Sequence, residues 1–241
     1  MINPKYSLLA ETLNHQYNSA PEYPHIVLDD FLDPTVIADA EYEAKWLTDN
    51  FNQEEWRFGS PDYHEDQWLK RGIKELDKMT YAHNLLCRYM NSYTFIEFLR
   101  KMSGIEDLVP DWELEGGGFH VTYPDGSLNI HHDFNYKEIE GRTMYRKINL
   151  LIYLNEEWLA EWDGSLELWK SDLSECFEII DPKHNRAVFF NIEDAPHGHP
   201  QPLKCPQNDN RRSLAFYYYS AIPPKNRLYD RAHWKHGNRL V

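Results

Sequence analysis

The chain has 241 residues and a formal net charge of −14, because its 39 acidic side chains outnumber its 25 basic ones. This length is enough for one catalytic domain with a core of its own, so disulfides or structural metals are not needed for stability. The negative charge argues against sequence-independent binding to nucleic-acid phosphates or to an anionic membrane surface, and neither is expected as a partner.

The N-terminal part of the sequence predicts an arm, a short strand and a long helix. Residues 1–23 are expected to form the arm and residues 25–28 the strand. Asp33 suits the N-cap of the helix and Pro34 its first turn. Apolar residues then recur at helical spacing up to about residue 48: Val36, Ile37, Ala40, Ala44 and Leu47. This helix is expected to pack on a sheet.

Residues 51–73 have no regular period, because Gly59 and Pro61 interrupt them, and they are predicted to form a loop or lid. Trp56 and Trp68 could stack on a substrate or pin this loop, and pinning is favoured. Two further helices are predicted over residues 76–89 and 93–102. Ser92 suits the start of the second helix and Gly104 its end.

The rest of the chain predicts strands, over residues 112–123, 128–134, 146–154, 166–169, 176–180, 187–192 and 213–220. Helices followed by many strands indicate an α+β, mainly β domain whose β part is a sandwich or barrel. We expect a single domain, with helical support and lid in about 1–109, the β core in about 110–222 and a basic tail in 223–241. A solvent-facing tail that folds over the barrel is favoured over a substrate-binding one.

One strand carries a possible pair of metal ligands, His131 and Asp133. Residues two apart on a strand point to the same side, so these two can reach one ion while His132 points away. A further imidazole follows at His197, and a cation that could hold an acidic co-substrate follows at Arg211. Two histidines and one carboxylate leave open positions on the metal and favour non-haem Fe(II).

Several motifs occur in a fixed order along the chain and together resemble a known family. They are Pro24 to Leu32, Tyr123-Pro124-Asp125-Gly126, His131-x-Asp133, Tyr153-Leu154-Asn155 with Trp158, Gly164-Ser165-Leu166, His197, and Arg211-x-Ser213. In this order they resemble the Fe(II)- and 2-oxoglutarate-dependent oxygenases, and within these the prolyl-4-hydroxylase-like group. The resemblance covers about residues 23–219, which is most of the chain.

The resemblance implies a double-stranded β-helix, which is a cupin-like jelly-roll barrel, with the N-terminal helices buttressing its outer face. It implies that His131, Asp133 and His197 bind the iron. It further implies that Arg211 pairs with the distal carboxylate of 2-oxoglutarate, for which a guanidinium fork is suited. By the same resemblance, Tyr153 and Tyr123 contact the co-substrate, with the better motif match at Tyr153.

Two alternatives within the site stay open at this point. His199 could replace His197 as a ligand if the preceding loop is shifted, although His197 fits the resemblance better. Period-two alternation allows only one of Arg211 and Arg212 to face the interior of the barrel, and Arg211 is preferred. Separate substitutions of His197 and His199 would show which of the two is the ligand.

The resemblance implies an Fe(II)- and 2-oxoglutarate-dependent dioxygenase that consumes O2 and hydroxylates an unactivated C–H bond. Ascorbate is a candidate additional requirement. The expected substrate is a peptidyl proline or a related amino-acid side chain. The alternatives are a non-redox, cupin-like metal enzyme or a binding module, and the pair of Arg211 with Tyr153 argues for a keto acid beside the metal.

Cysteine usage and the N-terminus suggest where the protein is found. Cys87, Cys176 and Cys205 are widely spaced without a Cys-x-x-Cys motif, which is typical of reduced thiols. Residues 1–16 lack a basic region followed by an apolar run, and the sequence contains no stretch of about 20 apolar residues. A soluble cytoplasmic protein is therefore expected.

Overall fold

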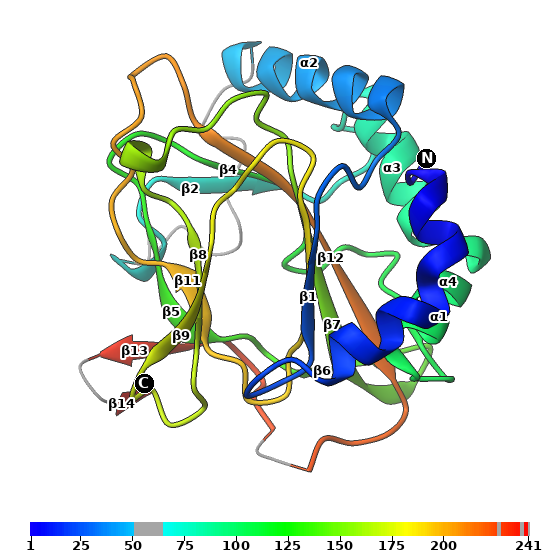
Figure 1. The fold of residues 1–241 in the computed structure, drawn as a ribbon. Helices are drawn as coiled ribbons and strands as arrows, with labels where there is room; N and C mark the ends of the chain where they lie inside the picture. The colour runs from blue at the N-terminus through cyan, green and yellow to red at the C-terminus, as the bar shows by residue number, and fades with distance from the viewer. Residues whose placement is uncertain (51–64, 226–227, 237–238, 241) are drawn as a thin grey trace.

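The computed structural model describes residues 1–50, 65–225, 228–236 and 239–240. Residues 51–64 of the predicted lid, with Trp56, therefore lie outside the described part. The described helices are α1 (Pro4–Asn18), α2 (Pro34–Asn50), α3 (Tyr81–Met90) and α4 (Tyr93–Ser103), with the short 3-10 helices η2 (Glu65–Gln67) and η3 (Ala160–Trp162). Figure 1 shows the four α-helices gathered on one side of the strands.

Two antiparallel sheets make up most of the structure. The larger has the order β1 (His25–Leu28), β10 (Ala187–Asn191), β7 (Arg142–Tyr153), β12 (Arg211–Ser220), β4 (Gly118–Thr122) and β2 (Lys70–Ile73), with β3 (Val109–Pro110) paired to β12 and β6 (Tyr136–Ile139) paired to β7. The smaller has the order β14 (Arg239–Leu240), β13 (His233–His236), β5 (Leu128–His132), β11 (His197–His199), β8 (Leu166–Trp169) and β9 (Cys176–Ile180). The prediction of a mainly β protein with a few helices is confirmed.

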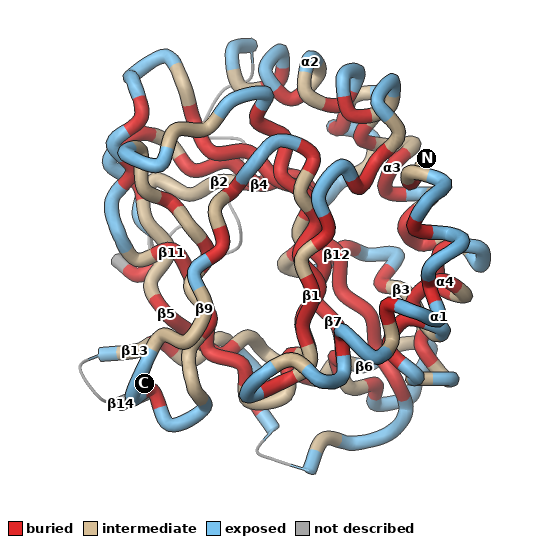
Figure 2. Tube along the Cα trace, viewed as in Figure 1, coloured by how far each residue is buried: buried red, intermediate tan, exposed pale blue. Residues whose placement is uncertain are grey.

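The central strand β12 is buried along its whole length (Figure 2). Its side chains alternate between two environments. Leu214 and Phe216 belong to the large apolar cluster that also contains residues of the four helices. Arg211 and Ser213 instead line a cavity on the other face of the sheet. Because directly paired residues of neighbouring strands point to the same face, this alternation also tells which residues of β4 and β7 face the cavity.

Helix α4 forms as its sequence predicts. The Ser92 hydroxyl accepts a hydrogen bond from the Phe95 N–H at the first turn, and Gly104 ends the helix in the left-handed region with φ +78°. Phe95, Leu99 and Met102 recur at helical spacing and are fully buried. Helix α3 begins at Tyr81, five residues later than the predicted start, and α2 extends two residues beyond its predicted end.

The predicted N-terminal arm is wrong, because residues 4–18 form helix α1. The Asn3 side chain accepts a hydrogen bond from the Lys5 N–H and Pro4 occupies the first turn, so the helix has a regular start. Its buried side chains are spaced by three or four residues: Tyr6, Ala10, Leu13 and Tyr17. This face packs against α4, which explains why so polar a segment is helical.

The two ends of the chain contribute strands to the sheets. Strand β1 forms at the predicted place, whereas β2 forms within the predicted loop or lid, and both join the larger sheet. Strand β13 comes from the predicted solvent-facing tail and pairs with β5 in the smaller sheet. The expected long strand over 112–123 is shortened to β4, because Asp111 accepts hydrogen bonds from two following N–H groups and so forms a turn there.

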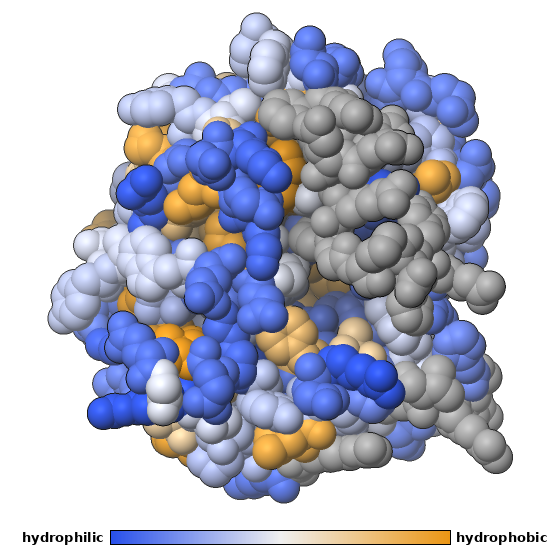
Figure 3. All heavy atoms as spheres, turned by 180° about the vertical axis from the view of Figure 1, so that it is seen from behind, coloured by the Kyte–Doolittle hydropathy of each residue, from blue (hydrophilic) through white to orange (hydrophobic). Residues whose placement is uncertain are grey.

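The helices and the surface agree with the composition. Among the described residues, none of the helices combines the length and the hydrophobicity that crossing a membrane requires. The described residues that are visible from behind are mostly hydrophilic, and the hydrophobic ones among them lie in small groups (Figure 3). Such a surface is expected for a chain with a net charge of −14.

Candidate metal centre and active site

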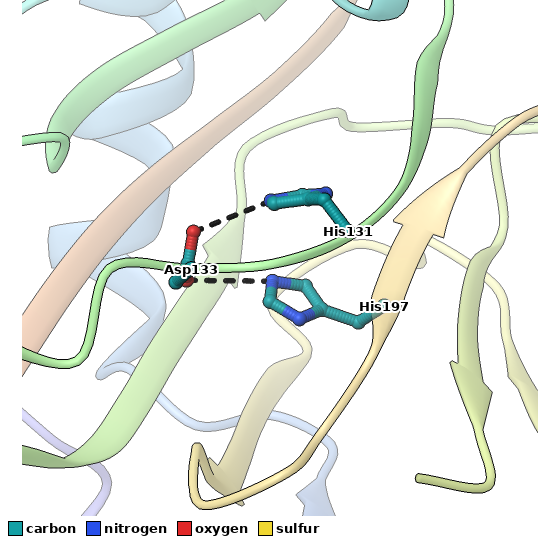
Figure 4. A group of neighbouring side chains, drawn as sticks. All are labelled: His131, Asp133 and His197. Atoms are coloured by element: carbon teal, nitrogen blue, oxygen red, sulfur yellow. Dashed lines mark ion pairs between the residues drawn. The ribbon is translucent and has the colours of Figure 1, made fainter. Parts of the chain in front are cut away.

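Three predicted ligands converge where β5 and β11 lie side by side. His131 and His197 are directly paired in the antiparallel ladder of these two strands, and Asp133 follows the end of β5. The ligand atoms of the three side chains all lie within 4.8 Å of one another. The Asp133 carboxylate lies 3.3 Å from His131 Nε2 and 3.6 Å from His197 Nε2 (Figure 4). The pairing of β5 with β11 therefore brings His197 to two ligands that are distant from it in the sequence.

The backbone orients both imidazole rings in the same way. His131 Nδ1 lies 2.9 Å from the Asn129 carbonyl oxygen, and His197 Nδ1 lies 2.9 Å from the Ala195 carbonyl oxygen. A carbonyl oxygen can only accept, so each Nδ1 carries the proton and donates it. In the neutral ring, Nε2 then presents its lone pair toward Asp133. This tautomer is the one that binds a metal through Nε2.

The charges of this cluster fit a bound cation. Burial lowers the pKa of His197 to about 4, so this imidazole is neutral at pH 7. Burial alone would raise the pKa of Asp133, but the Arg146 guanidinium and the nearby imidazoles outweigh it and hold that pKa well below its ordinary value. A carboxylate and imidazole lone pairs therefore face one another, and a metal ion between them would remove the repulsion of these acceptors.

Two residues that were not predicted from the sequence, Arg146 and Asn149, contact the Asp133 carboxylate. Arg146 Nη1 lies 2.9 Å from Asp133 Oδ2, and Asn149 Nδ2 donates a hydrogen bond of 2.8 Å to the same oxygen. The buried guanidinium is packed between two aromatic rings, 3.9 Å from the Phe134 centroid and 3.8 Å from the Tyr217 centroid. The sequence signal was two polar residues, Arg146 and Asn149, close before the apolar end of β7.

A cavity of about 190 Å³ extends from these ligands toward Arg211. Arg211 and Lys70 are both paired with Thr122 in the ladders on either side of β4, so all three side chains project to the same face. Among the described residues that line the cavity, Asp133 is the only acidic one, whereas Lys70 and Arg211 are both basic. The end of the cavity away from Asp133 is therefore suited to an anion.

Arg211 is buried without an acidic partner among the described residues. Its Nε donates to the Gly164 carbonyl oxygen at 2.8 Å, and its Nη2 donates to the Tyr153 hydroxyl at 3.2 Å. A buried guanidinium stays charged and is costly unless an anion offsets it. Tyr153 is fully buried and its hydroxyl contacts this guanidinium, but it does not line the cavity, so its contact with the co-substrate stays a prediction.

The alternation of β12 separates Arg211 from Arg212. Arg212 lines a different and larger cavity of about 950 Å³ beneath α2, and its Nη2 lies 3.2 Å from Asp209 Oδ1. That larger cavity holds none of the three converging ligands. The smaller cavity is therefore the candidate active site, and Arg211 is the arginine that faces it.

The structure does not support the predicted co-substrate contact of Tyr123. This residue packs against the apolar cluster that contains the helices and does not line the cavity. The reason is the period of two residues along this stretch, which places Phe119 and Val121 on the helix side together with Tyr123. His120 lines the cavity instead, and the sequence reasoning did not identify it.

His199 lines the cavity but does not belong to the group of three ligands. The register of β11 shifts after His197, so His199 pairs with Leu128. Its Nε2 lies 3.5 Å from the Thr122 hydroxyl, and its buried Nδ1 has no hydrogen-bond partner among the described residues. The geometry thus assembles His197, not the rival His199, with His131 and Asp133.

Gly198 allows β11 to approach β5 closely between these two histidines. A Cβ atom there would lie 2.6 Å from the Asn129 carbonyl oxygen and 2.7 Å from that of Leu128. We expect Gly198→Ala to push the strands apart and to lower the free energy of unfolding by about 1–3 kcal/mol. We also expect it to weaken Co(II) binding, which a titration measures. Gly141→Ala is the control for destabilisation alone, because its φ of +74° strains an alanine there while a Cβ would meet open space, so Co(II) affinity should not change. Unchanged Co(II) affinity in Gly198→Ala would contradict the expectation.

The comparisons with known proteins agree with this geometry. A family model described as the 2OG-Fe(II) oxygenase superfamily matches residues 117–219. No curated protein matches the sequence significantly. Solved structures share the fold at low identity, which shows likeness of fold alone.

Two of these solved structures are prolyl hydroxylases, and a third is HygX. A prolyl-4-hydroxylase from Pseudomonas putida has 16% identity and a TM-score of 0.59, covering 88% of this chain and 99% of its own. A prolyl hydroxylase from Trichoplax adhaerens, in complex with a hypoxia inducible factor peptide fragment, has 15% identity and a TM-score of 0.62, covering 90% and 91%. HygX from Streptomyces hygroscopicus, with nickel and 2-oxoglutarate bound, has 12% identity and a TM-score of 0.53, covering 86% of each chain.

Proposed function

We propose that this chain, whose residues 117–219 belong to the 2OG-Fe(II) oxygenase superfamily, hydroxylates an unactivated C–H bond of a peptidyl proline or a related amino-acid side chain. It is a dioxygenase that uses Fe(II), 2-oxoglutarate and O2. The observation that carries the proposal is one cavity that joins the His131, Asp133 and His197 group to Arg211, which is buried and has no acidic partner among the described residues.

We further propose that residues 1–241 form a single domain whose two sheets are the halves of a double-stranded β-helix. The supporting observation is that each sheet contributes one part of the site. The smaller sheet carries His131 and His197, and the larger carries Arg211. A cavity between two such sheets keeps water away from the reacting groups.

Each residue has a distinct task in this proposal. His131, Asp133 and His197 would hold Fe(II), and the bound metal supplies the activation of O2 with electrons from 2-oxoglutarate. Arg146 and Asn149 keep the Asp133 carboxylate in place by their contacts with Oδ2. Arg211 would form charge-assisted hydrogen bonds with the distal carboxylate of 2-oxoglutarate, which fixes the position and the plane of that group.

The substrate class is supported by the lining of the cavity and by the likeness of fold. Leu128, Leu151 and Leu166 give the cavity an apolar part, which suits an uncharged ring or aliphatic side chain. The fold is shared with prolyl hydroxylases, one of which was solved in complex with a peptide fragment. A non-redox cupin-like enzyme or a binding module would not need a buried guanidinium beside the metal ligands.

Succinate release across libraries of proline-containing peptides and free amino acids tests this function, with mass spectrometry of the products. We expect one member to gain a single oxygen atom in step with succinate. Succinate release without any gain of oxygen on a proline or related side chain, together with oxidation of another chemical class, would refute the substrate assignment. No Fe(II)-dependent turnover of 2-oxoglutarate at all would refute the reaction itself.

Lys70 predicts a pH dependence of co-substrate binding. Burial and the nearby Arg211 charge lower the pKa of Lys70 from its ordinary value to about 7. Lys70 is therefore cationic below pH 7 and becomes neutral above it. We expect 2-oxoglutarate affinity to fall as the pH rises through about 7, because one of two cations in the cavity is lost. Calorimetric titration with 2-oxoglutarate from pH 6 to 8.5 checks this. The Lys70→Met variant is expected to bind 2-oxoglutarate more weakly than the wild type at low pH, with an affinity that does not change with pH. A wild-type profile identical to that of Lys70→Met would contradict the expectation.

A further inference from the structure

The C-terminal segment 229–236 lies beside strand β5, which carries His131 and ends directly before Asp133. Strand β13 pairs with β5, with Trp234 opposite His131 and His233 opposite His132. Strand β11 pairs with the other edge of β5, with His197 opposite His131. Directly paired residues share a face, so Trp234, His131 and His197 form one row across three neighbouring strands.

The side chains of the segment pack on both histidines of β5. The buried Trp234 ring lies 4.7 Å from the His131 ring, measured between centroids, at an interplanar angle of 33°. The buried Tyr229 ring is stacked on the His132 ring at 5.1 Å. The contact with Trp234 covers the ligand ring, while Nδ1 of that ring is held by the Asn129 carbonyl oxygen.

Hydrogen bonds fasten the segment to the chain before and after the ligand pair. Asn129 Nδ2 donates to the Lys235 carbonyl oxygen at 2.9 Å. The Asn135 N–H donates to the Tyr229 carbonyl oxygen at 2.9 Å, and the Tyr229 N–H donates to Asn135 Oδ1 at 2.8 Å. Between these two attachments, Ala232 lines the active-site cavity. The segment is thus anchored on the metal centre and borders its cavity.

We propose that segment 229–236 is a built-in part of the metal centre and that Trp234 is a positioning residue for His131. The proposal rests on the proposed function for the identity of the metal, and it assigns to the C-terminus a role that composition alone did not suggest. Trp234 restricts rotation of the His131 ring and keeps Nε2 directed at Asp133. Groups that orient a metal ligand from outside the coordination sphere contribute measurably to metal affinity.

The test is a titration of the full-length chain with Co(II), and with Fe(II) plus 2-oxoglutarate under anaerobic conditions. We expect Trp234→Ala to weaken Co(II) binding by about 10-fold, whereas Trp234→Phe keeps a ring against His131 and stays near the wild-type value. Trp112→Ala is the matched control, because Trp112 is 58% exposed and lies outside the cavity lining. The visible charge-transfer band of the Fe(II) complex with 2-oxoglutarate should shift or weaken in Trp234→Ala alone.

Fluorescence provides a second readout that does not depend on the alanine variant folding. Co(II) at the ligand group lies beside Trp234, so it should quench this indole strongly. Quenching by Co(II) is therefore expected to be smaller in Trp234→Phe than in Trp112→Phe. Wild-type affinity and spectrum in a folded Trp234→Ala, or equal quenching in the two phenylalanine variants, would overturn the proposal. A wild-type chain that binds neither metal would instead refute the proposed function.

Discussion

Replacing His197 with alanine is expected to abolish Fe(II)-dependent turnover of 2-oxoglutarate, whereas His199→Ala should keep metal binding. His197 is one of three side chains whose ligand atoms converge, and His199 is not. Changes in groups that only support a ligand cost about 10–100-fold, so loss of a ligand itself should exceed about 100-fold in Co(II) affinity. Anaerobic Co(II) titration and succinate release measure the two effects.

The two histidine variants control for each other, because both residues are buried and lie on the same short strand. Circular dichroism should show that both variants are folded. His199→Ala is expected to affect co-substrate binding more than metal binding, since His199 lies toward Thr122 and Arg211. Retained metal binding in His197→Ala with loss in His199→Ala would reverse the assignment of the third ligand.

Replacing Arg211 with methionine is expected to raise the KM for 2-oxoglutarate by about 100-fold, with Co(II) affinity nearly unchanged. Each hydrogen bond to a charged group contributes about 1.5–3 kcal/mol, and 1.4 kcal/mol corresponds to about tenfold. Arg211→Lys should lie between the wild type and Arg211→Met, because it keeps the charge but loses the planar fork. Steady-state kinetics of succinate release, with Co(II) titration alongside, give both quantities.

Arg212→Met is the matched control for this prediction. Arg212→Met removes the same charge one residue away, where Arg212 lines the larger cavity together with residues of α2. We expect its KM for 2-oxoglutarate to stay close to that of the wild type, although loss of the contact with Asp209 should reduce stability slightly. An equal rise of KM in both variants would show that general charge, not a specific contact, holds the co-substrate.

The parts of the site that the sequence predicted are those set by short-range rules. His131 lies on β5 and Asp133 directly follows its end, two residues later, so strand geometry predicts their common direction. The helix ends at Ser92 and Gly104 follow from local hydrogen bonding and backbone preference in the same way. The third ligand, His197, was predictable only because the order of the motifs along the chain resembles that of a known family.

The parts that were missed depend on the register between distant strands. Arg146 reaches Asp133, and Trp234 reaches His131, through pairings that no local pattern encodes. Tyr123 was placed in the site by the family resemblance, but it follows β4 and packs against the apolar cluster that contains the helices. The missed helix α1 is a different case, because its cap and its apolar spacing were present in the sequence and could have been used.

The central position of β5 between β11 and β13 has a consequence for how the protein matures. Neither neighbour of β5 in this sheet is next to it in the sequence, so the row of Trp234, His131 and His197 is completed only after β11 and β13 have both paired with β5. An unfolded chain has no such row, and we expect it to bind metal more weakly than the folded molecule. Iron would therefore bind mainly the folded molecule. By mass action, this binding would stabilise the folded molecule against unfolding and proteolysis.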